Sequence, residues 1–201
     1  MHRLLEDKIM AMNFKIFETK ELTDIFAADL LRKQIHNNPE SILALDVNED
    51  LTQAYQKFVG EVKNHPADLS EVQIYAVGSE GLDVFKNLDI PSSQLNSGGT
   101  ADDLDNKGKK KVNVALLNLN ANKKVGFNND NDELLKAKEL FIYATGKDKS
   151  DVVRRLYDAE LEGSGMLSEI KSHRMVTVVI DKDAAGGLDQ DIVEYYTYKF
   201  A

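Results

Sequence analysis

The stretch that decides the fold is SILALDVNEDLTQAYQKFVGEV, residues 41–62. Its first part, residues 41–47, consists mostly of Ile, Leu, Ala and Val, which is typical of a strand covered on both faces. Apolar residues then recur at the three-to-four spacing of a helix, at Leu51, Ala54, Tyr55, Phe58, Val59 and Val62. The stretch therefore predicts a buried strand followed by a helix with one apolar face.

The same alternation continues on both sides of this unit. Further strands are predicted over residues 13–18, 72–77, 112–119, 140–144 and 175–180. Helical spacing is found over residues 22–35, where Thr19 can cap the helix, and again over residues 152–157 and 166–170. Alternating strands and helices imply right-handed crossovers. The predicted fold class is α/β, a three-layer Rossmann-like sandwich with a mainly parallel sheet flanked by helices.

One segment interrupts this rhythm. Residues 89–111 are rich in Pro, Ser, Gly and Asp, so we expect a surface excursion that includes at most a short helix. A helix is predicted over residues 134–138. A chain of 201 residues is long enough for one substantial core. We therefore expect an N-terminal extension over residues 1–11 and a single domain over residues 12–201.

Composition excludes several classes of function. The formal net charge of −9 repels nucleic acid, and no apolar run reaches the roughly 18 residues that a membrane-spanning helix needs. The chain has no cysteine, and its first residues lack the apolar core of a secretion signal. We expect a cytoplasmic protein that binds neither nucleic acid nor membrane.

A ligand site is expected at the carboxyl ends of the strands, because loops diverge there and helix N-termini point their amides at the crevice. In this sequence those ends are residues 46–50, 78–80, 118–129, 145–149 and 181–185.

The C-terminal part carries a recognisable pattern of residues. Gly146 and Lys149 precede a helix, Ser168, Ile170 and His173 follow, and the strand VTVVID at residues 176–181 leads to an alanine pair. This order resembles the end of the glucosamine-6-phosphate deaminase/isomerase family, which is also related to 6-phosphogluconolactonase. There a Gly and a Lys precede a P-x-S-x-L-Q-x-H element and a V-T-V-I-V-D strand. The resemblance implies that Lys149 neutralises a sugar phosphate.

A second match covers residues 118–129, NLNANKKVGFNN. The family signature there is G-x-G-x-D-G-H-x-x-F-N-E, and Phe127 and Asn128 fall in register with it. Asn122 stands in place of the acid, Lys124 in place of the histidine and Asn129 in place of the glutamate. An amide has no titratable proton near neutral pH, and a solvated lysine stays protonated. The resemblance thus predicts a divergent member without the family's catalytic groups.

Two more landmarks of the family are altered. Its T-G-G/S-T-P phosphate loop corresponds to residues 47–51, VNEDL, whose carboxylates repel a phosphate. Its D-E-Y element, with the proton-transferring aspartate, corresponds to Gly78, Ser79 and Glu80. The candidates for catalysis that remain are Glu80 and Lys124, and the candidates for ligand binding are Lys149, Asn122, Asn128 and Asn48. No metal and no cofactor are expected.

Three functions stay open at this point. The first is a non-catalytic, isomerase-like binder of a small sugar phosphate, a pseudoenzyme of carbohydrate metabolism. The second is a sugar-phosphate isomerase or hydrolase with remodelled chemistry, in which Glu80, Lys124 and Lys149 act as base, electrophile and phosphate ligand. The third is an interaction module or homo-oligomer, in which the aromatic residues near the C-terminus form a terminal strand or pack across an interface: Tyr195, Tyr196, Tyr198 and Phe200.

Overall fold

The computed structural model describes residues 12–77, 82–97, 111–121 and 134–198. These residues form one seven-stranded sheet in the order β1-β7-β6-β5-β2-β3-β4, and every pair of neighbouring strands is parallel. The strands are β1 (Met12–Phe17), β2 (Ile42–Asp46), β3 (Gln73–Val77), β4 (Leu95–Asn96), β5 (Val114–Asn118), β6 (Glu139–Ala144) and β7 (Val176–Asp181). The predicted α/β fold class is confirmed.

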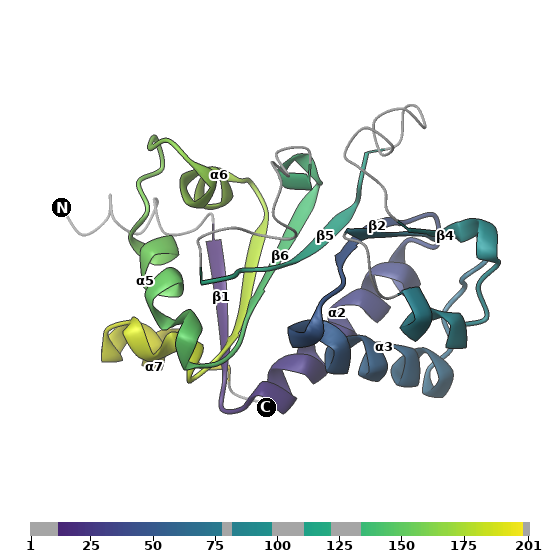
Figure 1. The fold of residues 1–201 in the computed structure, drawn as a ribbon, viewed down its shortest axis with the longest axis horizontal. Coiled ribbons are helices and arrows are strands. Elements are labelled where there is room, and N and C mark those ends of the chain that lie inside the picture. The colour runs from purple at the N-terminus through teal and green to yellow at the C-terminus, as the bar shows by residue number, and fades with distance from the viewer. Residues whose placement is uncertain (1–11, 78–81, 98–110, 122–133, 199–201) are drawn as a thin grey trace.

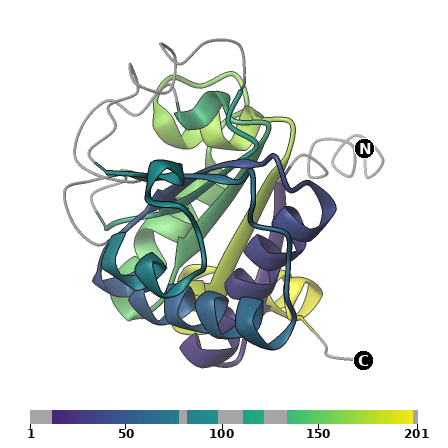
Figure 2. The same ribbon diagram turned by 90° about the vertical axis from the view of Figure 1, so that its right-hand side faces the viewer.

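Helices cover both faces of the sheet. The α-helices are α2 (Lys20–Asn37), α3 (Thr52–Asn64), α5 (Ser150–Asp158), α6 (Met166–Ser172) and α7 (Gln190–Tyr196). In Figure 1, α2 and α3 lie on the right and α5, α6 and α7 on the left, and Figure 2 turns the α2–α3 side toward the viewer. The predicted three-layer arrangement is therefore present.

The core is divided by the sheet because successive side chains of a strand point to opposite faces. On β6, Leu140, Ile142 and Ala144 belong to the buried cluster that includes α5 and α6. Phe141 and Tyr143 belong to the other cluster, which includes α2 and α3. A strand with both faces covered is a nearly continuous apolar run, and this is why the strands were visible in the sequence.

The first helix begins as its sequence predicts. Thr19 has extended backbone geometry, and its hydroxyl accepts a hydrogen bond of 3.3 Å from the amide of Leu22. This bond satisfies one of the amides that a helix N-terminus leaves unpaired. The cap fixes the start of α2 directly after β1, so Lys20 lies at the carboxyl end of the sheet.

Two local predictions were wrong, and a third was incomplete. The aromatic residues that the structure describes near the C-terminus are not in a strand: Tyr195 and Tyr196 are in α7, and Thr197 makes an isolated bridge to Ile16, while Phe200 lies outside the described residues. Tyr196 packs on the ring of Phe14, which draws the segment into a helix against β1. The helix predicted over residues 134–138 is a single 3₁₀ turn, η4 (Leu134–Lys136). The segment after residue 89 has the short helical turn that was expected, η3 (Ser92–Gln94), but it also contains the unexpected short edge strand β4, which pairs with β3.

The remaining short elements are 3₁₀ turns, and three of them lie at strand ends: η1 (Glu49–Leu51), η5 (Lys147–Lys149) and η6 (Ala184–Gly187). Two others, η2 (Leu82–Asn87) and η3 (Ser92–Gln94), lie between β3 and β4. None of the helices in the described parts of the chain combines the length and apolar character needed to cross a membrane.

Candidate functional site

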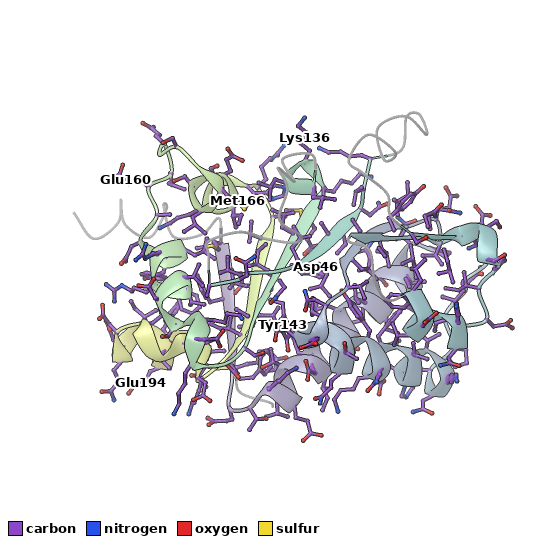
Figure 3. The ribbon with its side chains drawn as sticks, in the orientation of Figure 1. Asp46, Lys136, Tyr143, Glu160, Met166 and Glu194 are labelled. Carbon is purple, nitrogen blue, oxygen red and sulfur yellow. The ribbon has the colours of Figure 1, made fainter. Side chains whose placement is uncertain are left out.

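Polar side chains from five strand ends meet at the carboxyl edge of the sheet. They follow β1, β2, β5, β6 and β7, and the central ones lie on β2, β5 and β6, which are neighbours in the sheet. Because all strands are parallel, their carboxyl ends lie on the same edge. Figure 3 shows Asp46 and Tyr143 in the interior of the molecule, whereas Glu160 and Glu194 lie at its outside.

Asp50 contacts polar side chains from two other strand ends at this edge. Its Oδ2 accepts a hydrogen bond of 2.9 Å from Asn118 Nδ2 at the end of β5, and it lies 3.4 Å from Lys149 Nζ. Lys149 Nζ also donates to Asp148 Oδ2 at 2.9 Å. We call Asp50, Asn118, Lys149 and Asp148 the Asp50 cluster. It joins the loops that follow β2, β5 and β6.

Lys149 is held in this cluster as a buried cation. Its side chain is only 11% exposed. Burial alone lowers its pKa, but the hydrogen bond that Lys149 donates to Asp148 and the charges of Asp50 and Asp148 outweigh burial, so the pKa of Lys149 is raised. The ammonium group therefore stays charged and can serve as an electrostatic anchor, not as a base or an imine-forming amine.

Asp46, the last residue of β2, is the most perturbed carboxyl group of the edge. It is 1% exposed, and its Oδ2 accepts a hydrogen bond of 3.0 Å from the backbone amide of Asn118. Burial raises its pKa from 3.8 to about 6. Hydrogen bonds from the Asn118 backbone amide and from the Asn48 side chain act in the opposite direction, and the charge of Asp50 adds to the increase. A carboxyl group with this pKa changes its protonation state close to physiological pH.

Two buried oxygens at this point lack a partner among the described residues, Asp46 Oδ1 and Asn118 Oδ1. Buried polar atoms in proteins are nearly always hydrogen-bonded, so an unpaired acceptor needs a donor. A proton on Asp46 Oδ1 would turn one of these two acceptors into a donor, which agrees with the raised pKa of Asp46. The rest of Asp46 is firmly placed, because Tyr55 on α3 donates its hydroxyl to the Asp46 carbonyl at 2.6 Å.

A second polar network fixes the loop after β2 to α2 and β6. Lys20 Nζ donates to both carboxylate oxygens of Asp24 at 3.0 and 2.9 Å, to Tyr143 Oη at 3.0 Å and to the Asp50 carbonyl at 2.9 Å. The Tyr143 hydroxyl donates to Asp24 Oδ1 at 2.6 Å. Burial, followed by the hydrogen bond to Asp24, raises the pKa of Tyr143 far above its ordinary value, so the phenol stays protonated. Lys20, Asp24 and Tyr143 are thus hydrogen-bonded to one another, and Lys20 also holds the backbone of Asp50 in place.

The loop that carries Lys149 is fixed from β7. Asp181 Oδ1 accepts from the amides of Gly146 at 3.1 Å and Ala184 at 2.8 Å. Gly146 has a φ of 93°, a left-handed conformation that favours glycine. The matched glycine and aspartate of the C-terminal motif thus have a structural role here, which is to orient the turn η5.

Of the sequence-predicted ligand-binding residues, the structure places Lys149 and Asn48 at this edge. Asn48 caps η1, because its Oδ1 accepts a hydrogen bond of 3.2 Å from the amide of Leu51, and its side chain also contacts Asp46. Four candidates lie outside the described residues: Glu80, Asn122, Lys124 and Asn128. Within the described ranges, no group of three or more His, Cys, Asp or Glu side chains is arranged to hold a metal ion.

Asp46 and Asn118 were included in the strand ends where a ligand site was expected but were not singled out, and Lys20 was missed. The signal for the first two was available, since each is a polar residue at the carboxyl end of an otherwise apolar strand. Such residues are expected to face a site when the strand is central in the sheet.

Comparison with known proteins agrees with this architecture. No family model matches the chain. The glucosamine-6-phosphate deaminase of Clostridium botulinum (strain Loch Maree / Type A3) is 20% identical over 227 residues, covering 81% of this chain and 93% of the enzyme. The glucosamine-6-phosphate deaminase of Mycoplasma mycoides subsp. mycoides SC is 20% identical over 243 residues, covering 88% of this chain and 98% of the enzyme.

Two solved structures show the same fold. A monomeric glucosamine-6-phosphate deaminase superposes with a TM-score of 0.72 and 18% identity, covering 88% of this chain and all of the other. The 6-phosphogluconolactonase of Trypanosoma brucei gives a TM-score of 0.65 with 13% identity, covering 88% and 98% of the two chains. The chain is thus similar in sequence to glucosamine-6-phosphate deaminases, and it shares its fold with a glucosamine-6-phosphate deaminase and a 6-phosphogluconolactonase. More particularly, the chain is a distant relative of the glucosamine-6-phosphate deaminases, so the resemblance predicted from the sequence motifs is confirmed.

Proposed function

We propose that this protein binds a small sugar phosphate at the carboxyl edge of its sheet and does not catalyse the deaminase reaction. The observation that carries the proposal is Lys149, a buried and charged lysine at this edge that shares a partner, Asp50, with the side-chain amide of Asn118. A phosphate group is recognised by fixed cations and by N–H donors. The relatives are named as enzymes that act on a sugar phosphate, and their names suggest the ligand class.

The absence of turnover is proposed from the residues that stand at the family's catalytic positions. Asn122, Lys124 and Asn129 replace an acid, a histidine and a glutamate in the matched motif. One positioned acid or base contributes about 10²–10⁴-fold to a rate. Three such losses in one chain leave no efficient route for moving protons between the substrate and the protein.

The test combines a binding assay with an activity assay. A thermal-shift titration with glucosamine 6-phosphate should raise the melting temperature of the wild-type protein, because a ligand that binds only the native state stabilises it. Ammonia release from the same compound should stay at the background rate. Lys149→Met should abolish the ligand-induced shift. Lys147→Met removes an exposed lysine from the same turn and should leave the shift unchanged. A wild-type protein that releases ammonia at an enzymatic rate would refute the non-catalytic part.

A second candidate function, a sugar-phosphate hydrolase or isomerase with remodelled chemistry, is favoured by Asp46. A general acid or base works best with a pKa near the operating pH, and the pKa of Asp46 is raised to about 6. Hydrolysis of 6-phosphogluconolactone that follows an inflection near that pH and is lost in Asp46→Asn would establish this alternative. An unchanged rate in the variant would exclude Asp46 from the chemistry.

Three further predictions accompany the proposed function. We propose that the protein is cytoplasmic, which cell fractionation tests. We propose an N-terminal extension over residues 1–11 and a single domain over residues 12–201, which limited proteolysis tests. We also propose that the chain forms a homo-oligomer, which sedimentation tests.

A further inference from the structure

We infer that the Asp50 carboxylate is a built-in counter-anion, which fills the anion site formed by Lys149 and Asn118 and must leave before a phosphate group can bind there. The inference rests on the proposed function and concerns the regulation of that same site. It is carried by one geometric fact: a single oxygen, Asp50 Oδ2, is shared by Asn118 Nδ2 at 2.9 Å and Lys149 Nζ at 3.4 Å.

The two donors are those that a phosphate monoester would use. An ammonium group and an amide N–H both donate to anionic oxygens and have nothing to offer a cation. In the structure their shared partner is the chain's own carboxylate. Phosphate and carboxylate oxygens compete for the same donors, so both cannot occupy this position.

The carboxylate is the movable part of this arrangement and the donors are the fixed part. The Asp50 side chain is 39% exposed, whereas that of Lys149 is 11% exposed. The Asp50 backbone is held separately, because its carbonyl accepts from Lys20 Nζ at 2.9 Å. Rotation of the Asp50 side chain toward solvent therefore releases the donors without unfolding the loop.

The contact with Lys149 is also weak enough to be exchanged. Strong charge-assisted N–H···O bonds are about 2.7–2.9 Å long, and the Lys149–Asp50 distance of 3.4 Å exceeds this. A partly exposed ion pair contributes little to stability because solvent screens it. A phosphate dianion carries more charge and more acceptor oxygens than a carboxylate, and it gains from the same two donors.

The nearby carboxylates make the exchange selective. Asp46, Asp148 and Asp50 all lie around the donor pair, so an arriving anion is repelled unless one of these charges moves away. Neutralising Asp50 removes the one charge that both donors share, while Lys149 keeps its contact with Asp148 at 2.9 Å. Neutralising Glu49, its exposed neighbour in η1, leaves the donor pair occupied.

The experiment is calorimetric titration with inorganic phosphate and with glucosamine 6-phosphate. The proteins are the wild type, Asp50→Asn, Asp50→Ser, Glu49→Gln and the double variant Asp50→Asn/Lys149→Met. We expect both Asp50 variants to bind phosphate about tenfold more tightly or better, a change equivalent to about 1.4 kcal/mol. Glu49→Gln should stay within about twofold of wild type, and the double variant should lose the gain. Circular dichroism and urea unfolding identify any variant that fails to fold, and the serine variant replaces the asparagine variant in that case.

The outcomes separate this inference from the proposed function. Wild-type binding of glucosamine 6-phosphate with no gain in either Asp50 variant overturns the inference and leaves the proposed function standing. A gain in the Asp50 variants without any wild-type binding supports the inference and overturns sugar-phosphate binding by the native chain. Absence of binding by every protein overturns both.

Discussion

Replacing Asp46 by asparagine should change how the stability of this protein depends on pH. Asp46 is buried at the end of β2, and burial raises its pKa from 3.8 to about 6. The native state therefore holds the Asp46 proton more tightly than the unfolded chain does. The stabilisation that this proton provides is complete below pH 3.8 and is lost as the pH rises through about 6. An asparagine has no such proton, and its carbonyl can still accept the Asn118 amide hydrogen bond.

The magnitude follows from the shift. At about 1.36 kcal/mol per pKa unit, a rise from 3.8 to about 6 corresponds to about 3 kcal/mol between the fully protonated and fully ionised limits. Between pH 8 and pH 5, where protonation is only partly complete in the native state, about 1.4 kcal/mol of this is gained by the wild type. Asp46→Asn should thus be the more stable protein at pH 8, and its advantage should shrink by about that amount at pH 5.

Urea unfolding of both proteins at the two pH values measures this directly, provided that the denaturant slopes agree. Other carboxylates titrate in the same range, but they are common to both proteins and cancel in the difference. A difference in unfolding free energy that is independent of pH, or one that grows toward pH 5, would refute the assignment of a raised pKa to Asp46. Glu49→Gln, which changes an exposed acid of the next turn, serves as the matched control and should parallel the wild type.

Two other substitutions test the fixed parts of the edge. Tyr143→Phe removes the hydroxyl that donates to Asp24, and it should lower the unfolding free energy by about 1–3 kcal/mol because a buried carboxylate loses a donor. Tyr195→Phe is the control, since Tyr195 is 79% exposed, and equal losses in the two variants would contradict the role of the buried network. Gly187→Ala should cost about 1–3 kcal/mol, because its new methyl group would lie 2.7 Å from a backbone oxygen of α5. Gly186→Ala meets no atom within 4 Å and should be nearly neutral in thermal unfolding, so equal melting temperatures of the two alanine variants would exclude a close approach of η6 to α5.

The sequence predicts those helices and strands in which apolar residues recur at one regular spacing, because that spacing shows which face is buried. The strand and helix of residues 41–62 are found as β2 and α3 because both faces of the strand and one face of the helix are buried. The C-terminal segment was wrongly predicted from the β-propensity of its tyrosines. Ile192, Val193 and Tyr196 have helical spacing, and all three pack on the core cluster beside α5. Packing against a neighbour decided the structure there, as it often does where propensity is weak.

The spacing of apolar residues does not predict the order of the strands in the sheet. That order decides which residues meet in the site. Asp46 and Asn118 are 72 positions apart in the chain, and they meet because β5 pairs with β2 in the interior of the sheet. The sequence could identify Lys149 by its motif, since a motif needs no knowledge of neighbours. Its carboxylate partner Asp50 comes from the loop after another strand, and only the order of β2, β5 and β6 brings the two together.

The charge balance of this edge has a consequence for any ligand. The two lysines that contact Asp50 are already paired, Lys20 with Asp24 and Lys149 with Asp50 and Asp148. A neutral sugar gains no electrostatic energy from such balanced pairs, and an anion gains only if it displaces a carboxylate. Lys20 cannot release Asp24, which is fully buried and would be left as an uncompensated charge. Lys149 can release Asp50, whose side chain reaches solvent. Asp148 also reaches solvent and contacts Lys149, but Asp50 is the carboxylate that engages both Lys149 and Asn118. Binding of an anion between these two donors is therefore governed by Asp50, and the affinity should follow the charge at position 50 more closely than the charge at any other acidic position of the loop.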